Sequence, residues 1–279
     1  MKRGTTIDGA RVLITGAGSG IGRLMALDAA ARGAAEILIW DLSADSGEAV
    51  RDEITAAGGQ ARAFEVNVAD SAQVETVAER TGPVDILINC AGIVTGKKLL
   101  DADEAAIRRV FDVNTLALYW TTRVFLPGML ERDRGSVVTI ASAAGLTGVA
   151  RQTDYSASKW AAVGFTESLR SELRAEGSRV GTLAFCPFYI NTGMFDGVRT
   201  KFPRLLPILE ETDVATRVLD AVEAGREQLV MPSLVSLVPA LRLLPTRAFD
   251  KVMDFLGVNQ TMDHFTGRTG RSRQPTAGS

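Results

Sequence analysis

The chain has 279 residues, of which 46% are hydrophobic and 23% charged, and its formal net charge is −2. These fractions are those of a globular protein and exclude wholesale disorder, while a length of about 150 residues per domain allows one or two domains. A nearly neutral chain has no net electrostatic attraction to nucleic acid or to an anionic membrane, so we expect neither as a partner.

Short apolar runs alternate along the chain with longer stretches of helical periodicity. The predicted strands are residues 12–14, 37–40, 63–66, 86–88, 137–140 and 181–185, and the main helices are 21–32, 46–57, 71–79, 104–126 and 154–175. Strands that alternate with helices indicate βαβ units, hence a parallel sheet with helices on both faces. We expect an α/β, doubly wound, Rossmann-type single domain over residues 1–266. Residues 267–279 are expected to be a disordered tail, with a basic interaction arm as the less favoured reading.

The chain offers little for export, membrane insertion or metal binding. Its N-terminus is polar, and no run of about 18 uncharged apolar residues occurs, so we expect neither a secretory signal nor an integral membrane segment. The only cysteines, Cys90 and Cys186, fit small buried residues in a reducing compartment, and we expect a cytoplasmic location. The single histidine, His264, argues against a multi-histidine metal site and a Ser-His-Asp triad, so no metal is expected.

A glycine-rich turn follows the first predicted strand. Residues 15–22 read Thr-Gly-Ala-Gly-Ser-Gly-Ile-Gly and open a helix. Glycines permit a close approach to a pyrophosphate, and a helix N-terminus supplies N–H groups. Asp41 ends the second strand about 20 residues further on, where a carboxylate can accept hydrogen bonds from ribose hydroxyls. Alone, the turn could be a tight connection and Asp41 a helix cap; together they predict a dinucleotide site.

A second motif lies in the predicted helix over 154–175. Tyr155 and Lys159 are four residues apart, so their side chains project from one face of the helix. A neighbouring ammonium and the positive nicotinamide of an oxidised cofactor are expected to lower the phenol pKa from about 10, which suits an acid–base. Ser142 follows a strand at the ligand-binding end of the sheet and can bond a substrate oxygen. Alone, such a Tyr/Lys pair also occurs on ordinary amphipathic helices.

Two apolar stretches remain for a substrate. The long connection over 188–210 is expected to act as a substrate lid, with a loop that merely packs on the sheet as the alternative. The stretch 229–244 could wall a pocket, form a subunit interface or, least favoured, lie on a membrane surface. The candidate substrate residues are Phe188, Met194, Phe195, Leu146 and Val149.

Taken together, these motifs resemble the single-domain short-chain dehydrogenase/reductase family over about residues 8–250. Further matches are Asn-Val-Ala-Asp at 67–70, Asn-Cys-Ala-Gly at 89–92, and Asn114. The segments Trp-Asp at 40–41 and Ile-Ala-Ser-Ala-Ala-Gly at 140–145 are similar to the branch of retinol dehydrogenases and 17β-hydroxysteroid dehydrogenases, which act on apolar alcohols. Cys90 and Phe188 depart from the family pattern, which has asparagine and glycine there; the first could weaken a structural hydrogen bond.

The resemblance implies a role for each matching residue. Tyr155 would be the acid–base, Ser142 would orient the carbonyl, and Asn114 would hold a water that links Lys159 to solvent. Asp70 would contact adenine, and Thr192 the nicotinamide carboxamide or a phosphate. The full set of expected cofactor residues is Gly16, Ser19, Gly20, Ile21, Gly22, Asp41, Val68, Asp70, Asn89, Ala91, Gly92, Tyr155, Lys159, Pro187 and Thr192.

We interpret the chain as an NAD-dependent short-chain alcohol dehydrogenase/ketone reductase for an apolar, bulky secondary alcohol, or a long-chain, retinoid or steroid-like one. NADP is less favoured because its extra phosphate would meet the Asp41 carboxylate. By family analogy we expect a homodimer or homotetramer through the helices containing Asn114 and Tyr155. The alternative is a non-catalytic NAD-binding scaffold or redox sensor; a nucleotide-sugar epimerase usually has a larger C-terminal domain.

Overall fold

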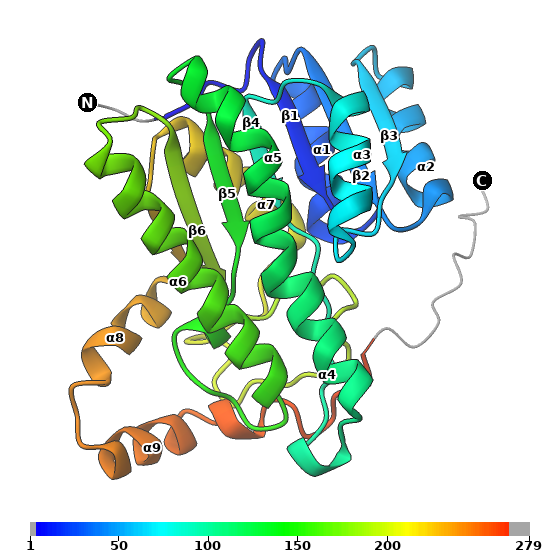
Figure 1. Cartoon of the computed structure of the whole chain (residues 1–279). Coiled ribbons are helices and arrows are strands. Elements are labelled where there is room, and N and C mark those ends of the chain that lie inside the picture. Colours follow the sequence, from blue (N-terminus) through cyan, green and yellow to red (C-terminus); the bar gives the residue numbers. More distant parts are fainter. Residues whose placement is uncertain (1–3, 268–279) are drawn as a thin grey trace.

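The structure is a computed structural model that describes residues 4–267, so the tail predicted at 267–279 lies outside it except for Gly267. Within these residues one seven-stranded parallel sheet forms, in the order β3-β2-β1-β4-β5-β6-β7 (Figure 1). This order confirms the doubly wound α/β fold, and it reverses between β1 and β4, where such sheets bind ligands. The strands are β1 Arg11–Thr15, β2 Glu36–Asp41, β3 Ala61–Glu65, β4 Ile86–Asn89, β5 Ser136–Ile140, β6 Gly181–Pro187 and β7 Gln228–Met231.

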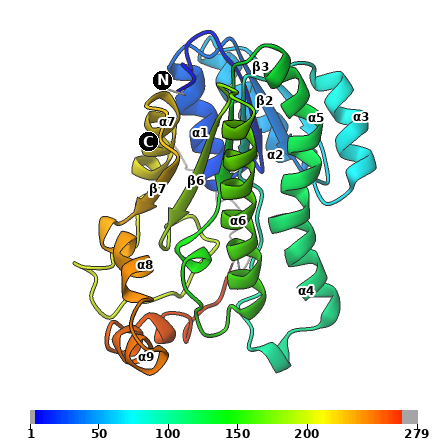
Figure 2. The same ribbon diagram turned by 60° about the vertical axis from the view of Figure 1, so that its left-hand side comes forward.

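Helices cover both faces of the sheet (Figure 2). On one face α1, α2 and α7 pack on the sheet, and on the other α3, α5 and α6 do so. Among residues 4–267 no helix combines the length and hydropathy needed to cross a bilayer. The helices are α1 Gly20–Ala31, α2 Ala44–Ala56, α3 Ser71–Thr81, α4 Glu104–Phe111, α5 Ala117–Glu131, α6 Thr153–Ala175, α7 Glu211–Glu223, α8 Val238–Leu241 and α9 Thr246–Phe255.

The apolar strands are buried on both sides, as expected of a covered parallel sheet. Val12 and Ile14 of β1 pack in the core under α1 and α7, whereas Leu13 between them packs in the core on the opposite face. Each such aliphatic side chain contributes roughly 1.5–3 kcal/mol when fully buried. A shift of one residue would exchange the two buried faces, so this alternation fixes the register of the strands and the position of their carboxyl ends.

The predicted helix over 104–126 is interrupted. A π-helical turn at Asp112–Leu116 separates α4 from α5, and it contains Asn114. Such turns add a residue to the helical repeat and are frequent at functional sites. The sequence analysis also assigned no strand or helix after residue 185, whereas the structure places α7, β7, α8 and α9 there. Figure 2 shows α8 and α9 beyond the carboxyl ends of β6 and β7.

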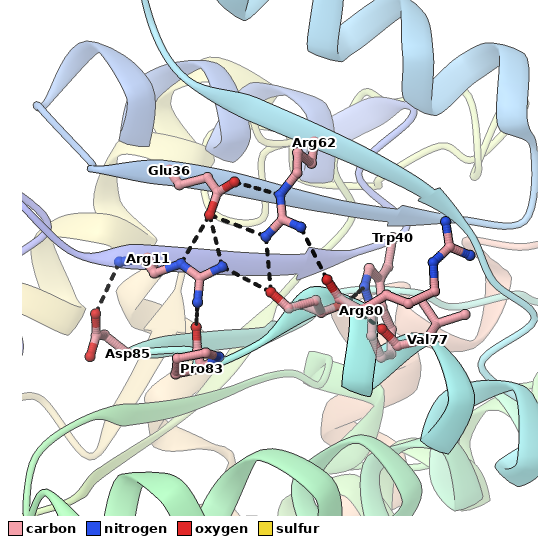
Figure 3. Close-up of polar contacts among 9 residues, drawn as sticks. Arg11, Glu36, Trp40, Arg62, Val77, Arg80, Pro83 and Asp85 are labelled. Atoms are coloured by element: carbon pink, nitrogen blue, oxygen red, sulfur yellow. Dashed lines mark hydrogen bonds and ion pairs between the residues drawn. The ribbon is translucent and has the colours of Figure 1, made fainter.

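A charged cluster joins the amino ends of the first three strands (Figure 3). Glu36 Oε2 accepts hydrogen bonds from Arg11 Nε and Nη2 at 2.9 and 2.8 Å, and Glu36 Oε1 accepts one from Arg62 Nε at 2.6 Å. Both guanidinium groups also donate to the carbonyl of Thr81 at the end of α3. Burial alone would raise the pKa of Glu36, but the hydrogen bonds from Arg62 and Arg11 outweigh it and lower that pKa. The cluster lies at the end of the sheet opposite the site and is structural.

Candidate active site

A cleft of about 510 Å³ runs across the carboxyl ends of the strands, from the end of β2 to the end of β6. Its wall combines residues from eight separate segments of the chain, which the doubly wound topology brings to one edge of the sheet. The structure thus brings together most of the predicted site. The predicted residues that line the cleft are Gly16, Ser19, Gly20, Ile21, Gly22, Asp41, Val68, Ala91, Gly92, Ser142, Tyr155, Lys159, Pro187 and Thr192.

The glycine turn at one end of the cleft is shaped by close packing. Gly16 has φ +68°, and a Cβ there would lie 3.0 Å from the Ala91 Cα. A Cβ at Gly18 would lie 2.8 Å from the carboxyl group of Asp41. Because α1 begins at Gly20, backbone N–H groups of its first turn have no intrahelical acceptor and lie at the cleft wall. This cradle fits the pyrophosphate of a dinucleotide.

Asp41 is held at the same end of the cleft by the backbone. Its Oδ2 accepts a hydrogen bond from Gly18 N at 2.8 Å, and its Oδ1 accepts one from Ser43 N at 3.0 Å. Arg23, the first cation after the glycine turn, pairs with Glu53 on α2 at 2.6 Å. The carboxylate therefore faces the cleft with its negative charge uncompensated by Arg23.

Tyr155 and Lys159 lie on α6 at the other end of the cleft, both 5% exposed. Lys159 Nζ donates to the carbonyl of Ile140 at 2.8 Å and lies 5.7 Å from the centre of the Tyr155 ring. Burial lowers the pKa of Lys159 to about 8. Burial also raises the pKa of Tyr155, and a hydrogen bond with Ser142 offsets only part of this rise. In the protein alone burial is thus the main influence on this phenol, and the lowering of the Tyr155 pKa by Lys159 together with the positive nicotinamide of an oxidised cofactor stays a prediction.

Asn114 lies beside this pair, although it does not line the cleft. From the π-helical turn, its Oδ1 accepts from Ile93 N at 2.9 Å, and its Nδ2 donates to the Ile93 carbonyl at 2.9 Å and to Ser158 Oγ at 3.0 Å. A Cβ on Gly92 would lie 3.4 Å from Asn114 Oδ1 and 3.6 Å from Lys159 Nζ. The asparagine and the lysine thus flank one glycine, and a relay through a water stays a prediction.

Two predicted cofactor residues lie outside the cleft wall. Asp70 caps α3, where its Oδ1 accepts from Ala72 N and Gln73 N at 3.0 and 3.2 Å. Asn89 is buried and its Oδ1 accepts from Thr121 Oγ1 at 2.7 Å, while its Nδ2 has no partner among residues 4–267. Their contacts with a cofactor stay predictions. Cys90 does line the cleft, and burial raises the pKa of its thiol to about 12, which disfavours the reactive thiolate at neutral pH.

An apolar cavity of about 230 Å³ opens beside Tyr155. It shares Ser142, Tyr155, Phe188 and Phe195 with the cofactor cleft, and Val149 also lines it. Of the other predicted substrate residues, Met194 lines the cofactor cleft and Leu146 packs in the adjoining core. Much of the remaining wall comes from the two apolar stretches predicted for a substrate: Leu205 and Leu206 belong to 188–210, and Leu234, Val235, Leu237, Val238 and Leu241 belong to 229–244. The sequence analysis missed Met253, Leu256 and Val258, which also line the cavity.

Comparisons with known proteins show the family to which the chain belongs. The sequence model of short chain dehydrogenases matches residues 10–202. Epidermal retinol dehydrogenase 2 of Homo sapiens is 40% identical over 266 residues, which cover 93% of this chain and 86% of that protein. Estradiol 17-beta-dehydrogenase 11 of Mus musculus is 36% identical over 252 residues, which cover 88% of this chain and 83% of that protein.

Two solved structures share the fold. A short chain dehydrogenase/reductase from Burkholderia phymatum, in complex with NAD, is 29% identical with a TM-score of 0.77 and covers 86% of this chain and 95% of its own. A putative NAD(P) dependent gluconate 5-dehydrogenase from Beutenbergia cavernae, with bound NADP at low occupancy, is 29% identical with a TM-score of 0.71 and covers 85% and 100%. These neighbours hold either nucleotide. The chain belongs to the short-chain dehydrogenase/reductase family, as an oxidoreductase related to retinol and steroid dehydrogenases.

Proposed function

We propose that this protein interconverts a bulky apolar secondary alcohol and its carbonyl with NAD(H) as the redox partner. The observation that carries the proposal is the apolar cavity, which shares Ser142 and Tyr155 with the cofactor cleft. A substrate in this cavity would place its hydroxyl near Ser142 and Tyr155, which line both the cavity and the cleft. The similarity to retinol and estradiol dehydrogenases supports the same substrate class.

The chain's own residues carry the proton and hold the substrate. When bound, the nicotinamide ring supplies or receives the hydride. Ser142 hydrogen-bonds the substrate oxygen, and the Tyr155 hydroxyl gives a proton to that oxygen in reduction or takes one in oxidation. Because burial raises the Tyr155 pKa, the phenol is protonated at neutral pH and ready for reduction. Lys159 would hold the nicotinamide ribose, and its charge supports phenolate formation below about pH 8.

NAD is proposed as the preferred nucleotide because of Asp41. A carboxylate accepts hydrogen bonds from a ribose diol, whereas the ribose phosphate of NADP would place two anions close together in a partly buried site. Since Arg23 is paired with Glu53, it is not placed to neutralise that phosphate. The pyrophosphate is common to NAD and NADP, so its contacts with the glycine turn do not distinguish the two nucleotides.

Steady-state kinetics on a panel of alcohols tests the proposal. We expect kcat/KM for long-chain secondary alcohols, retinol and hydroxysteroids to exceed that for short polar hydroxy acids, since each buried methylene adds roughly 0.8 kcal/mol. Phe195→Ala should remove part of this preference, because the Phe195 ring lines the cavity and packs 5.7 Å from the Tyr155 ring. Equal efficiency on a small hydroxy acid would contradict the apolar substrate. NAD binding without turnover of any alcohol would favour a non-catalytic scaffold.

A further inference from the structure

The apolar cavity contains polar side chains besides Ser142 and Tyr155. The polar side chains that line it, other than Ser142 and Tyr155, belong to Thr147, Gln152 and Tyr189. Gln152 immediately precedes α6 and is only 1% exposed. Its side chain does not cap the helix. Burying an amide without hydrogen bonds costs free energy, so it matters which groups bond the Gln152 side chain and which of its polar atoms are left for a ligand.

A chain of hydrogen bonds fixes the orientation of this amide. Gln152 Nε2 donates to the Tyr189 hydroxyl at 3.3 Å, and Thr261 Oγ1 lies 2.8 Å from the same hydroxyl. Thr261 donates its single hydroxyl hydrogen to the carbonyl of Val258 at 2.8 Å, so Tyr189 must be the donor to Thr261. The chain therefore runs from the Gln152 amide nitrogen to the Val258 carbonyl.

The phenol in the middle of this chain is rigid. The Tyr189 ring packs against Phe188 at 4.7 Å and Phe195 at 5.1 Å between ring centres. Burial raises the pKa of Tyr189 to about 12, so its hydroxyl keeps its hydrogen at neutral pH. Tyr189 follows β6, Gln152 precedes α6 and Thr261 follows α9, so three segments of the cavity hold the amide in place.

One side of the Gln152 amide is left for a ligand. Within the described part of the chain, Tyr189 is the only hydrogen-bond partner of this side chain. The carbonyl oxygen and one amide hydrogen are therefore available at the cavity wall. A hydroxyl group matches this pair, because it can donate to the oxygen and accept from the nitrogen.

We propose that Gln152 binds a second hydroxyl group of the substrate, so that the preferred substrate is an apolar diol or hydroxyketone rather than a simple alcohol. This rests on the proposed function, since it assumes that an alcohol enters the cavity. Gln152 and Tyr155 are separated by about one helical turn, or roughly 5 Å. The second hydroxyl is accordingly expected about two to four carbon atoms from the reacting carbon.

The wild-type enzyme provides the first test. Its kcat/KM is measured with NAD for a long secondary alkanol and for diols of the same carbon skeleton that differ in the spacing of the second hydroxyl. One spacing is expected to exceed the mono-alcohol by about tenfold, the worth of one well-made hydrogen bond. If no diol exceeds the mono-alcohol, the inference is overturned while the proposed function stands. If none of these alcohols reacts, the proposed function itself fails.

A pair of variants then locates the effect. Gln152→Met keeps the length of the side chain but removes both polar groups, and the ratio of diol to mono-alcohol kcat/KM is expected to fall by about tenfold. Thr147→Val is the matched control, since the Thr147 hydroxyl also lines the cavity but is directed to the Gly148 carbonyl at 3.4 Å. This control is expected to keep the wild-type ratio. An unchanged ratio in Gln152→Met, or an equal fall in both variants, would overturn the role of Gln152.

Discussion

At the scale of single residues, the Tyr155 hydroxyl is the group on which turnover is expected to depend. Tyr155→Phe removes the hydroxyl group and with it the transferable proton but keeps the ring, so kcat should fall by about 10²–10⁴-fold, the usual contribution of general acid–base catalysis. Affinity for NADH, measured by fluorescence titration, should stay within about threefold of wild type. Tyr119→Phe, on the exposed side of α5, is the control. Turnover within tenfold of wild type would show that Tyr155 is not the acid–base.

Lys159→Ala is expected to differ from Tyr155→Phe in a diagnostic way. Lys159 is proposed to hold the nicotinamide ribose and to favour the phenolate, so both NADH affinity and kcat should fall. Because burial places its pKa at about 8, the charge that assists oxidation is present below that pH and is lost as the pH rises through it. If Lys159→Ala lost turnover but kept full affinity for NADH, Lys159 would not hold the ribose, and only its electrostatic effect on the Tyr155 phenolate would remain.

Cofactor choice is also decided by one side chain, Asp41. The wild-type enzyme should prefer NAD by at least about tenfold in kcat/KM, which corresponds to about 1.4 kcal/mol. Asp41→Asn keeps the shape and the bond from Gly18 N to an oxygen, but it removes the charge that repels a ribose phosphate. The preference should therefore shrink mainly through better use of NADP. Asp45→Asn, an exposed carboxylate in the first turn of α2, should leave it unchanged. Equal use of both nucleotides by the wild type would rule out this role.

At the scale of secondary structure, sequence periodicity predicted the central elements well. The glycine turn, the end of β2 and the Tyr/Lys pair on α6 could be placed because each depends on local spacing and on an alternation of strands and helices. The π-helical turn around Asn114 could not be placed, since helical periodicity looks continuous across it. Leu146 and Met194 were assigned to the substrate because they are apolar and near the motifs. Leu146 packs in the adjoining core and Met194 lines the cofactor cleft, so their contacts with a substrate stay predictions. The wall made by α8 and α9 depends on contacts far apart in sequence.

The pairing of β1, β2 and β3 at their amino ends gives a prediction on stability. Glu36 has a folded-state pKa below its unfolded value of about 4.3, so its contribution is fully present above that pH and is lost as the pH falls through the folded-state pKa. Glu36→Gln should lower the free energy of unfolding by about 1–2 kcal/mol near neutral pH, because Arg11 and Arg62 lose a charged acceptor.

Urea unfolding of both proteins at about pH 6 and about pH 3 measures this dependence. The difference between wild type and Glu36→Gln should shrink at the lower pH, where Glu36 begins to be protonated. The matched control is Glu104→Gln, which removes an exposed (i, i+4) pair with Arg108 and should change little at either pH. A difference that is the same at both values would mean that the hydrogen-bond geometry, and not the charge of Glu36, stabilises the cluster.

At the scale of the whole molecule, the active site is a composite of distant segments. The cofactor cleft is formed mainly by segments that follow β1, β2, β4 and β6. The apolar cavity adds Leu205, Leu206 and the chain from η4 (Ser233–Leu237) to η5 (Val258–Gln260). The first part is built on the sheet and could be inferred from motifs. The second part is built on loops and short helices, where apolar composition indicates burial but not which residues face the ligand.

Exposed apolar side chains of the whole molecule also lead to a prediction about its oligomeric state. Large side chains stay partly exposed along α5 and α6 and in the π-helical turn before α5: Leu116 and Trp160 are 40% exposed and Tyr119 is 43% exposed. Figure 1 shows these two helices side by side at the front of the molecule, and the Tyr119 ring packs 4.8 Å from the Phe165 ring of α6. Apolar area of this kind contributes roughly 25 cal/mol per Å² when a second copy covers it. We therefore expect a homodimer or homotetramer that uses this face.

Light scattering coupled to gel filtration measures the assembly directly. The wild type is expected to elute as an even-numbered oligomer, and Tyr119→Glu should shift it toward the monomer, because a carboxylate in the centre of the covered face would be desolvated without a partner. Leu100→Glu is the control, since Leu100 is 95% exposed in the segment before α4, away from the centre of this face. It should leave the mass unchanged. A monomeric wild type, or dissociation by Leu100→Glu alone, would place the exposed rings of α5 and α6 outside any subunit interface.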